Sequence, residues 1–402
     1  MISVFTPSHT AQWLARAYAS LAEQTCRDWE WVLLLNGAAQ SADVAFDDPR
    51  VKIYREAGNG HVGALKKRCC ELASGSLLVE FDVDDELAPS CLEELSKVDG
   101  DFLYSNCIEI NSNGTPHVFS PFYGWQYRDV EWDGKPQKEA IAPEPYPSNL
   151  SRIWYAPNHV RAWRRDFYWK VGGHNEGMLI ADDHELILRS YIAGGKFVHI
   201  DKPLYIYHIH GKNTWLKNCA QIQRDQWSNY DKYIWPAIER WADEKDLLKI
   251  DLGGGIDKKD GYLGYDLQNA EITGDLNERW DLEDHSVGIL RAHDIIEHLR
   301  DPIHVMNEAY RVLAPNGFFM ISVPSALGQG GFCDPTHVSY WVQRSFRYYT
   351  EPGIRRYIEP RCTCKFQEMR LRDHLKYDNL PYVEAHLIAV KDAYRLHGAY
   401  HW

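Results

Sequence analysis

Two aspartates that frame a single residue, Asp82 and Asp84, follow directly on a short apolar segment at 76–81. That segment is rich in β-prone residues and is expected to be a buried strand. Open α/β sheets bind ligands at the edge where such strands end. Carboxylates there are the hard oxygen ligands that Mg²⁺ and Mn²⁺ take, with the remaining positions left to water and phosphates. The alternative is a solvated turn whose acids cap the next helix.

A second acidic pair, Asp182 and Asp183, precedes a helical stretch at 184–191. A helix N-terminus favours the ionised form of a carboxylate, which could then take a proton from a hydroxyl group. Asp182 could cap the helix while Asp183 does this chemistry. We therefore treat both as catalytic candidates, with Asp183 preferred as the base.

Two histidines, His208 and His210, follow an expected strand at 203–207. Alternate residues of a strand lie on one face, so both rings are expected on the same side. Imidazole suits Mn²⁺ better than Mg²⁺. His210 is the candidate metal ligand of the two.

The composition is that of a globular protein large enough for two cores. The chain has 402 residues, 45% of them hydrophobic and 25% charged, and domains seldom grow beyond about 250–300 residues. No apolar run reaches the ~18–20 residues of a membrane span, and the N-terminus starts as a strand without a signal-peptide pattern. The nine cysteines form no Cys-x-x-Cys pair, which favours reduced thiols and a cytoplasmic location. The net charge of −13 makes nucleic acid an unlikely partner.

The elements of the first half alternate in a way that predicts a largely parallel sheet. Helical spacing of apolar residues alternates with short β-prone runs, in the order β-α-β-β-α-β. Loops that leave parallel strands gather at one edge, so the residues that end these strands are expected together. The expected strands are 2–5, 29–35, 51–54 and 76–81, and the expected helices are 10–22 and 63–73.

The segments "ISVFTPSH", "QTCRDWEWVLLLNGA", "GNGHVGALKKRCCELASGSLLVEFDVDDEL" and "IADDHELILRSYIAGGKFVHIDKPLYIYHIHGKNTW" together resemble a family 2 glycosyltransferase of the GT-A fold. The resemblance covers residues 1–215 in the family's order. It implies transfer of a sugar from a nucleotide-sugar donor to a glycan-type acceptor, with inversion at the anomeric carbon.

The resemblance also implies roles for individual residues. Asn36 stands where many members carry an aspartate for the uracil edge, so the identity of the base is left open. The basic run 66–68 lies where the family places a cation near the diphosphate, and Lys67 is chosen from it. The implied nucleotide-sugar-binding residues are Thr6, Pro7, His9, Asn36, Lys67 and Asp82; the implied metal ligands are Asp82, Asp84 and His210; the implied base is Asp183.

An aromatic stretch lies between the two acidic pairs, punctuated by prolines that indicate irregular structure. Core packing is the default for such rings. Rings on loops beside a transferase site also provide surfaces on which sugars stack, so the acceptor pocket is expected here. The rings are Phe122, Tyr123, Trp125, Tyr127, Trp132, Tyr146, Trp154, Tyr155, Trp163 and Trp169.

The second half opens with a strand at 247–252 that runs into three glycines, and a further strand at 262–265 ends in Asp266. Glycines after a first strand let the backbone approach a ligand, and an acid after the second accepts bonds from ribose hydroxyls. An NAD-binding domain would look alike up to this point. The segments "IDLGGGIDKKDGYLGYDL", "GDLNERWDLEDHSVGILRAHDIIEHLRDPIHVMNEAYRVLAPNGFFMISVPS" and "DPTHVSYW" resemble a class I S-adenosylmethionine-dependent methyltransferase over residues 247–345.

This second resemblance implies a cofactor site. The loop 256–260 is short for a full helix, which leaves a non-catalytic domain open, and Glu297, His298 and His337 are candidates for the acceptor base. The implied cofactor-binding residues are Asp251, Gly253 and Gly255 for the methionine end and the turn, Asp266 for ribose, Asp275 and Leu276 beside adenine, and His293 beside the sulfonium.

The sequence thus predicts an α/β protein with a GT-A domain over 1–217, a helical connector over 218–245 and a Rossmann-like methyltransferase domain over 246–402. The expected function is metal-dependent inverting sugar transfer coupled with S-adenosylmethionine-dependent O-methylation. The expected cofactors are Mn²⁺ or Mg²⁺ and S-adenosylmethionine. Two alternatives remain open: a glycosyltransferase with a non-catalytic second domain, and a glycan- or nucleotide-binding module without activity.

Overall fold

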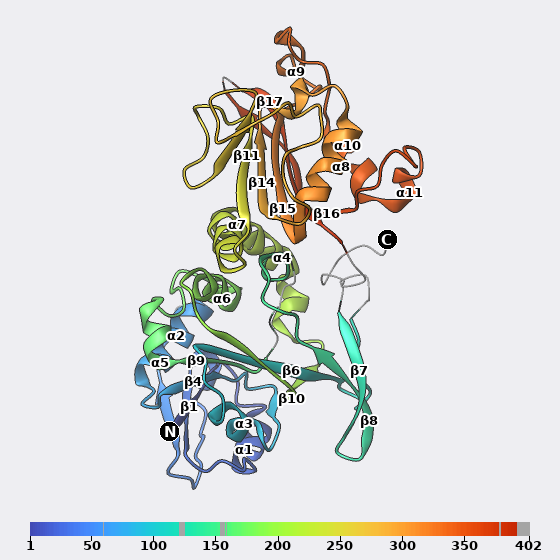
Figure 1. Cartoon of the computed structure of the whole chain (residues 1–402). Coiled ribbons are helices and arrows are strands. Elements are labelled where there is room, and N and C mark those ends of the chain that lie inside the picture. Colours follow the sequence, from blue (N-terminus) through green and yellow to red (C-terminus); the bar gives the residue numbers. More distant parts are fainter. Residues whose placement is uncertain (59, 120–124, 153–156, 158, 378, 392–402) are drawn as a thin grey trace. The chain divides into compact units, whose positions relative to one another are not determined.

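The computed structural model describes the chain except residues 59, 120–124, 153–156, 158, 378 and 392–402 (Figure 1). The chain divides into two compact units, Met1–Pro145 with Asn149–Ile234, and Tyr146–Ser148 with Trp235–Trp402. The division falls within helix α7 (Thr214–Glu244), which departs from helical geometry at Asn218 and contains Pro236. The predicted boundaries after residues 217 and 245 stay a prediction. Among the described residues, no helix is both long enough and apolar enough to cross a bilayer.

The first unit is built on a mixed sheet, and the four strands at one side of this sheet are parallel. Among the described residues the sheet has ten strands in the order β3-β2-β1-β4-β9-β6-β10-β5, and the β7–β8 hairpin joins through β6. Register places Ser8 beside Leu35 and Phe5 beside Glu80, so the carboxyl ends of β1, β2 and β4 share one edge. The strands are β1 (Ile2–Ser8), β2 (Trp29–Leu35), β3 (Val51–Arg55), β4 (Leu77–Glu80), β5 (Glu86–Leu87), β6 (Phe102–Asn111), β7 (Gln126–Trp132), β8 (Lys135–Ile141), β9 (Arg161–Arg164) and β10 (Phe197–Ile209).

Apolar patterning accounts for the centre of this sheet. All seven residues of β2 are buried, as expected of a strand covered on both faces. Strand β1 runs three residues beyond the predicted end at Phe5, because β2 supplies backbone partners as far as Leu35. The helices of the unit are α1 (Leu14–Ala22), α2 (Val62–Leu72), α3 (Cys91–Ser96), α5 (Arg165–Lys170) and α6 (Asp182–Ile192), with a 3₁₀ turn η1 (Gly37–Ala39). The short helix α4 (Pro147–Arg152) has residues in both units.

The second unit contains a sheet in the order β13-β12-β11-β14-β15-β17-β16. Strands β11 to β15 are parallel, and β17 runs antiparallel to β15 and β16. The strand order reverses between β11 and β14, which is the switch point where doubly wound sheets bind ligands. The strands are β11 (Leu248–Leu252), β12 (Leu263–Asp266), β13 (Ile272–Thr273), β14 (Val287–His293), β15 (Leu313–Pro324), β16 (Phe366–Lys376) and β17 (Leu380–Ala389).

Helices α8 and α10 lie beside the strands of the second sheet (Figure 1). Met306 of α8 and Phe346 of α10 are fully buried in one core with the strands. The link from β11 to β12 has turns but no helix over residues 253–262. The helices are α8 (Pro302–Val312), α9 (Gly330–Cys333), α10 (Gln343–Thr350) and α11 (Pro352–Arg355), with a 3₁₀ turn η3 (Ile296–His298). The two-sheet α/β class predicted from the sequence is confirmed.

Candidate active sites

Asp84 and His210 meet at the carboxyl edge of the first sheet. The His210 Nε2 atom lies 2.8 Å from Asp84 Oδ2, and the ring stacks on Trp13 with centroids 5.3 Å apart. The backbone N–H of His210 donates to the side chain of Asn213 at 2.8 Å. His210 is therefore fixed against Asp84 by stacking on one side and by its own backbone on the other.

The neighbouring residues Asp85 and His208 make contacts that hold the fold together. Asp85 is buried and accepts 2.8 Å hydrogen bonds from the Tyr205 hydroxyl and the His208 backbone N–H. The His208 ring lies 2.7 Å from Glu86, so the two histidines contact different acids. Because β10 ends at Ile209, a shared face for the two rings stays a prediction. Asp85 thus ties the acidic loop to β10.

Asp82 carries charge that the protein does not fully neutralise. The pKa of Asp82 is raised to about 7, because desolvation disfavours its ionised form and Glu80 and Asp84 add repulsion that Lys66 only partly offsets. His159 Nε2 lies 3.8 Å from Asp82 Oδ2, yet burial lowers the pKa of His159 to about 3 and leaves the ring neutral. A divalent cation would supply the missing positive charge.

The three predicted metal ligands suit such an ion but are not all in contact. Asp84 and His210 form the preassembled part. Among the described residues, Asp82, Asp84 and His210 do not gather as a set within 4.8 Å of one another. Because Mg²⁺ and its relatives often take one or two carboxylates and complete their shell with water and substrate phosphates, the donor set fits the ion.

Asp183 begins α6 together with Asp182 and lies against Arg161. Its Oδ2 accepts from the Arg161 guanidinium and its Oδ1 from the His184 backbone N–H at 2.7 Å. Despite desolvation, Arg161 and Lys66 hold the pKa of Asp183 well below its usual range. Its side chain is 17% exposed, whereas that of Asp182 is 3% exposed, so Asp183 is the more accessible of the two.

The proposed capping role of Asp182 differs from what is found. Ala181 is the N-cap residue, with a positive φ of 58° and no side-chain cap. Asp182 instead points to a buried basic group, with Oδ2 3.6 Å from Lys66 Nζ and 3.5 Å from His174 Nε2. Burial raises the pKa of Asp182 to about 6 even though Lys66 opposes the change.

Lys66 is the central cation of the first site. Its Nζ lies 2.5 Å from Glu80 Oε1, and its side chain is only 9% exposed. Asp182 and Glu80 keep the pKa of Lys66 above its usual value against the cost of burial. In turn Lys66 and Arg161 lower the pKa of Glu80 to about 2.

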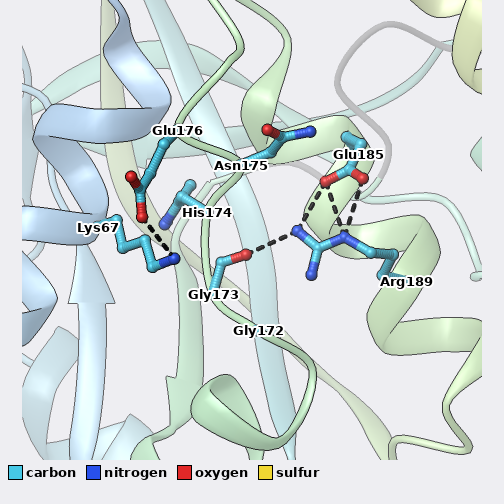
Figure 2. Close-up of a pocket in the computed structure, with 8 residues that line it drawn as sticks. All are labelled: Lys67, Gly172, Gly173, His174, Asn175, Glu176, Glu185 and Arg189. Atoms are coloured by element: carbon cyan, nitrogen blue, oxygen red, sulfur yellow. Dashed lines mark hydrogen bonds and ion pairs between the residues drawn. The ribbon is translucent and has the colours of Figure 1, made fainter.

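Lys67, chosen from the sequence for the diphosphate, lies at a different place. Its Nζ pairs with Glu176 Oε1 at 2.7 Å at the rim of a pocket of about 350 Å³ (Figure 2). On the other side of this pocket the Arg189 guanidinium donates hydrogen bonds to the Glu185 carboxylate and to the Gly173 carbonyl. The structure therefore brings Lys66, rather than Lys67, into contact with the acids of α6 and β4.

The predicted nucleotide residues line the carboxyl ends of β1 and β2. The Thr6 hydroxyl is buried and already engaged, donating to Phe81 O at 2.7 Å and accepting from Trp31 Nε1 at 2.9 Å. His9 is exposed, while Asn36 is 7% exposed. Pro7 lies between Thr6 and His9 on the same edge. Any contact of Thr6 with a nucleotide would use its backbone.

The aromatic stretch has buried, partly buried and undescribed members, and the partly buried ones are Tyr127, Trp132, Tyr146 and Trp169. Trp163 is fully buried, and the Tyr127 hydroxyl donates to Glu109 at 3.1 Å. Phe122, Tyr123, Trp154 and Tyr155 lie outside the described residues. The acceptor platform stays a prediction.

The second unit gathers Gly253, Gly255 and Asp266 at the switch point. Gly253 has a φ of +67°, and a Cβ there would lie 2.5 Å from Ile295, so no other residue fits this turn. Gly255, with a φ of +46°, lies so close to Asp266 that a Cβ would be 3.3 Å from Oδ2. The Leu267 backbone N–H donates to Asp266 Oδ1 at 2.6 Å. This cradle suits the backbone approach and ribose contact of an S-adenosyl cofactor.

The other predicted cofactor residues have varied surroundings. Asp251 is fully buried, and Arg291 Nη1 lies 2.8 and 2.6 Å from its two oxygens. Arg291 also lies 2.8 Å from His293 Nδ1, and the pKa of His293 is lowered to about 3, by burial first and then by Arg291. Asp251 thus holds the Arg291–His293 pair in place.

Two further predicted residues differ in exposure. Asp275 is exposed and accepts from the Asn277 backbone N–H at 2.8 Å. Leu276 is buried in the apolar core of the unit. Their placement beside adenine stays a prediction.

Sequence reasoning missed Arg161, His159 and Trp13. Arg161 and His159 could not be found locally, because Arg161 is 81 residues from Glu80 in the chain and His159 is 77 residues from Asp82. Trp13 lies within the predicted helix 10–22, and helical spacing alone does not indicate its contact with His210. A signal was present for Lys66, since Gly63, Lys66 and Cys70 fall at the three- and four-residue spacing of one buried helix face.

Comparison with known proteins agrees with the division of the chain into two units. The family model for glycosyl transferase family 2 matches residues 3–102, and the model for a methyltransferase domain matches residues 256–321. The O-antigen biosynthesis protein RfbC of Myxococcus xanthus is 25% identical over 218 residues, 51% of this chain and 16% of that protein. A chondroitin synthase of Pasteurella multocida is 24% identical over 284 residues, 62% of this chain and 27% of that protein.

The chain spans about a third or less of the length of the curated relatives it matches. The likeness to solved structures is weaker. S. aureus TarS 1–349 in complex with UDP-GlcNAc has a TM-score of 0.42 and 13% identity, over 64% of this chain and 76% of that one. By its two family-model matches, the chain carries a domain of glycosyl transferase family 2, and a methyltransferase domain follows it.

Proposed function

We propose that the first domain transfers a sugar from a nucleotide-sugar donor to a glycan-type acceptor, with inversion and with the help of a divalent cation. The observation that carries this proposal is the electrostatic arrangement at the sheet edge. Lys66 and Asp84 act electrostatically on Asp82. His210 contacts Asp84, and Arg161 holds Asp183 ionised. The named relatives make or contribute to polysaccharides, which supports a glycan acceptor.

Each group has a role that its surroundings support. Asp84, His210 and Asp82 would hold Mn²⁺ or Mg²⁺, which when bound neutralises charge on a leaving diphosphate. Asp183 accepts the proton of the acceptor hydroxyl. Both its oxygens already accept one hydrogen bond each, but a carboxylate has about four acceptor positions, so a hydroxyl can still bind.

The direct test is donor binding by the full chain. A panel of nucleoside diphosphate sugars should include at least one that raises the melting temperature in the presence of Mn²⁺ or Mg²⁺ and does so much less with chelator. Asp84→Asn should abolish the metal-dependent part of this rise in melting temperature. Equal stabilisation with and without chelator would contradict the role of the metal. If no donor stabilises the protein, the proposal of sugar transfer is contradicted.

Metal-dependent binding of a nucleoside diphosphate should strengthen as the pH rises towards about 7. The pKa of Asp82 is raised to about 7, so at lower pH a bound proton must leave before the carboxylate can bind an ion. Below that pKa the affinity should fall by up to about tenfold per pH unit. Calorimetric titration of the diphosphate at fixed Mn²⁺ reports on this domain alone. Asp82→Asn should flatten the profile, and a flat profile in the unmodified protein would contradict the role of Asp82.

For the second domain we propose S-adenosylmethionine-dependent O-methylation of a glycan. S-adenosylmethionine, when bound, supplies the electrophilic methyl group. Gly253 and Gly255 would let it approach the backbone, Asp266 would bind its ribose, and Asp251 would act through Arg291 as a positioning residue. The space at the switch point, which exists because Gly253 and Gly255 have no Cβ atom, supports this proposal. The missing helix after Gly255 among the described residues of this loop favours the alternative, a glycosyltransferase with a non-catalytic second domain.

Asp266→Ala should weaken the binding of S-adenosylhomocysteine on the order of tenfold or more, because a carboxylate that accepts ribose hydroxyls makes charge-assisted hydrogen bonds of about 1.5–3 kcal/mol each. Calorimetry on the full chain measures the change. Asp260→Ala, which removes an exposed acid from the link between β11 and β12, is the matched control and should bind normally. If the unmodified protein shows no heat at millimolar ligand, the second domain does not use this cofactor.

A further inference from the structure

Three metal-ligating side chains of the second unit converge beside the cofactor edge. Glu297 and His298 belong to η3, just after β14, and His337 comes from the loop between α9 and α10. One ligand atom from each lies within 4.8 Å of the others. The two segments are joined by backbone, because Val338 and Ser339 each donate an N–H to the Glu297 carbonyl at 2.9 Å. The cluster is therefore part of the fold.

A second observation is independent of this convergence. The Glu297 side chain is only 2% exposed, and neither of its carboxylate oxygens has a hydrogen-bond partner among the described residues. Its closest basic contact is His337 Nε2 at 4.0 Å. A buried carboxylate without donors costs free energy, and native structures usually compensate such groups.

The two imidazoles are oriented as metal ligands usually are. His337 Nδ1 lies 3.1 Å from the Gly331 carbonyl, and His298 Nδ1 lies 3.0 Å from the Thr336 hydroxyl and 3.3 Å from its carbonyl. A ligating histidine commonly donates its other ring N–H to such a carbonyl, which fixes the tautomer. This leaves the Nε2 lone pair of His337 on the side of Glu297. Thr336 is itself held by Asp334.

We propose that Glu297, His298 and His337 bind a first-row divalent cation such as Zn²⁺ or Mn²⁺. Two imidazoles and one carboxylate suit these ions better than Mg²⁺ or Ca²⁺. Three protein ligands leave coordination positions open. The His337 side chain is only 6% exposed, so substrate oxygens would reach the ion from the side of His298, which is partly exposed. This site is separate in residues and in domain from the Asp84–His210 pair.

The position of the cluster gives the ion a role in the proposed methyl transfer, and that role rests on the proposed function. Ile295, two residues before Glu297, closes over Gly253 of the cofactor loop. The cation would thus lie at the same edge as the methyl donor and could hold one or two hydroxyl groups of a sugar acceptor there. The substrate class that fits is a glycan with free hydroxyls able to chelate a metal.

The test uses the full chain carrying Asp82→Asn and Asp84→Asn, so that ligands of the first domain do not contribute. Zn²⁺ binding is measured by equilibrium dialysis, and Mn²⁺ binding by the paramagnetic resonance signal of the free ion. We expect about one ion per chain, and at least about a tenfold loss of affinity in His337→Ala and in Glu297→Gln, as for ligands of a three-residue site. His304→Ala is the matched control, because His304 lies in the same unit and bonds to the Glu278 carbonyl; it should bind normally.

Thermal unfolding separates a lost ligand from a damaged fold. Without metal, Glu297→Gln should be at least as stable as the parent, since it removes a buried charge that lacks a partner. With Mn²⁺ or Zn²⁺ only the parent should gain stability. No binding at millimolar metal, or binding that survives both His337→Ala and Glu297→Gln, would overturn the proposal. Titration with S-adenosylhomocysteine is run alongside. If the chain binds the ion but not S-adenosylhomocysteine, the metal site is retained and its role in methyl transfer is rejected. If the chain binds S-adenosylhomocysteine but no ion, only the metal site is rejected.

Discussion

Asp183→Asn should lower the rate of sugar transfer by about 10²–10⁴-fold and leave donor affinity nearly unchanged. The reason is that the substitution removes a proton acceptor that acts in the transition state and does not bind the nucleotide. Asparagine keeps an oxygen for the His184 N–H that now donates to Asp183, but it removes the negative charge that Arg161 contacts, so thermal unfolding of the variant is measured as well. Steady-state kinetics together with donor titration measures the two effects separately.

The matched variant is Asp182→Asn. Asp182 is 3% exposed and faces Lys66 and His174, so its loss should reduce stability more than catalysis. Because Arg161 and Lys66 hold the pKa of Asp183 well below its usual range, the rate should not titrate with this carboxylate between about pH 5 and about pH 8. Near-normal transfer in Asp183→Asn, combined with loss in Asp182→Asn, would assign the base to Asp182.

Features that depend on local sequence could be predicted well. Strand β4 and the acids after it were predictable because a β-prone run and its polar end are adjacent in the chain. Strand β11 and its glycines were predictable for the same reason, and Gly253 adopts the positive φ that such a turn requires. In these places propensity, periodicity and turn chemistry agree.

Partners that come from distant parts of the chain could not be predicted. Arg161 lies directly across from Glu80 in the antiparallel pair of β9 and β4, and 81 residues separate them in the sequence. Nothing local indicates that β9 inserts next to β4. Which of Lys66 and Lys67 meets Glu80 could not be predicted for a related reason. Neighbouring residues of a helix point about 100° apart, and only the packed face of α2 decides which one contacts Glu80. The role of Lys67 at the diphosphate stays a prediction.

Lys66→Met should destabilise the first domain by about 3–5 kcal/mol, the cost expected when one partner of a buried ion pair is removed. Glu80 and Asp182 would then be left buried with less positive charge nearby. Lys67→Met, at the next position, is the control. Lys67 pairs with Glu176, whose side chain is 62% exposed, so its loss should cost less than about 1 kcal/mol. Denaturant unfolding of the full chain, followed by a signal from the first domain, measures both.

The effect of Lys66→Met should also depend on pH in a definite direction. The pKa of Asp182 is already raised to about 6 by burial, with Lys66 opposing the rise. Without Lys66 it should rise further above its value in the unfolded chain. A carboxyl whose pKa is higher in the folded state gains stability as it becomes protonated, so the variant should recover part of its lost stability when the pH falls from about 8 to about 5. Equal destabilisation at both pH values, or a similar loss in Lys67→Met, would show that Lys66 does not serve as the buried counter-charge of these two acids.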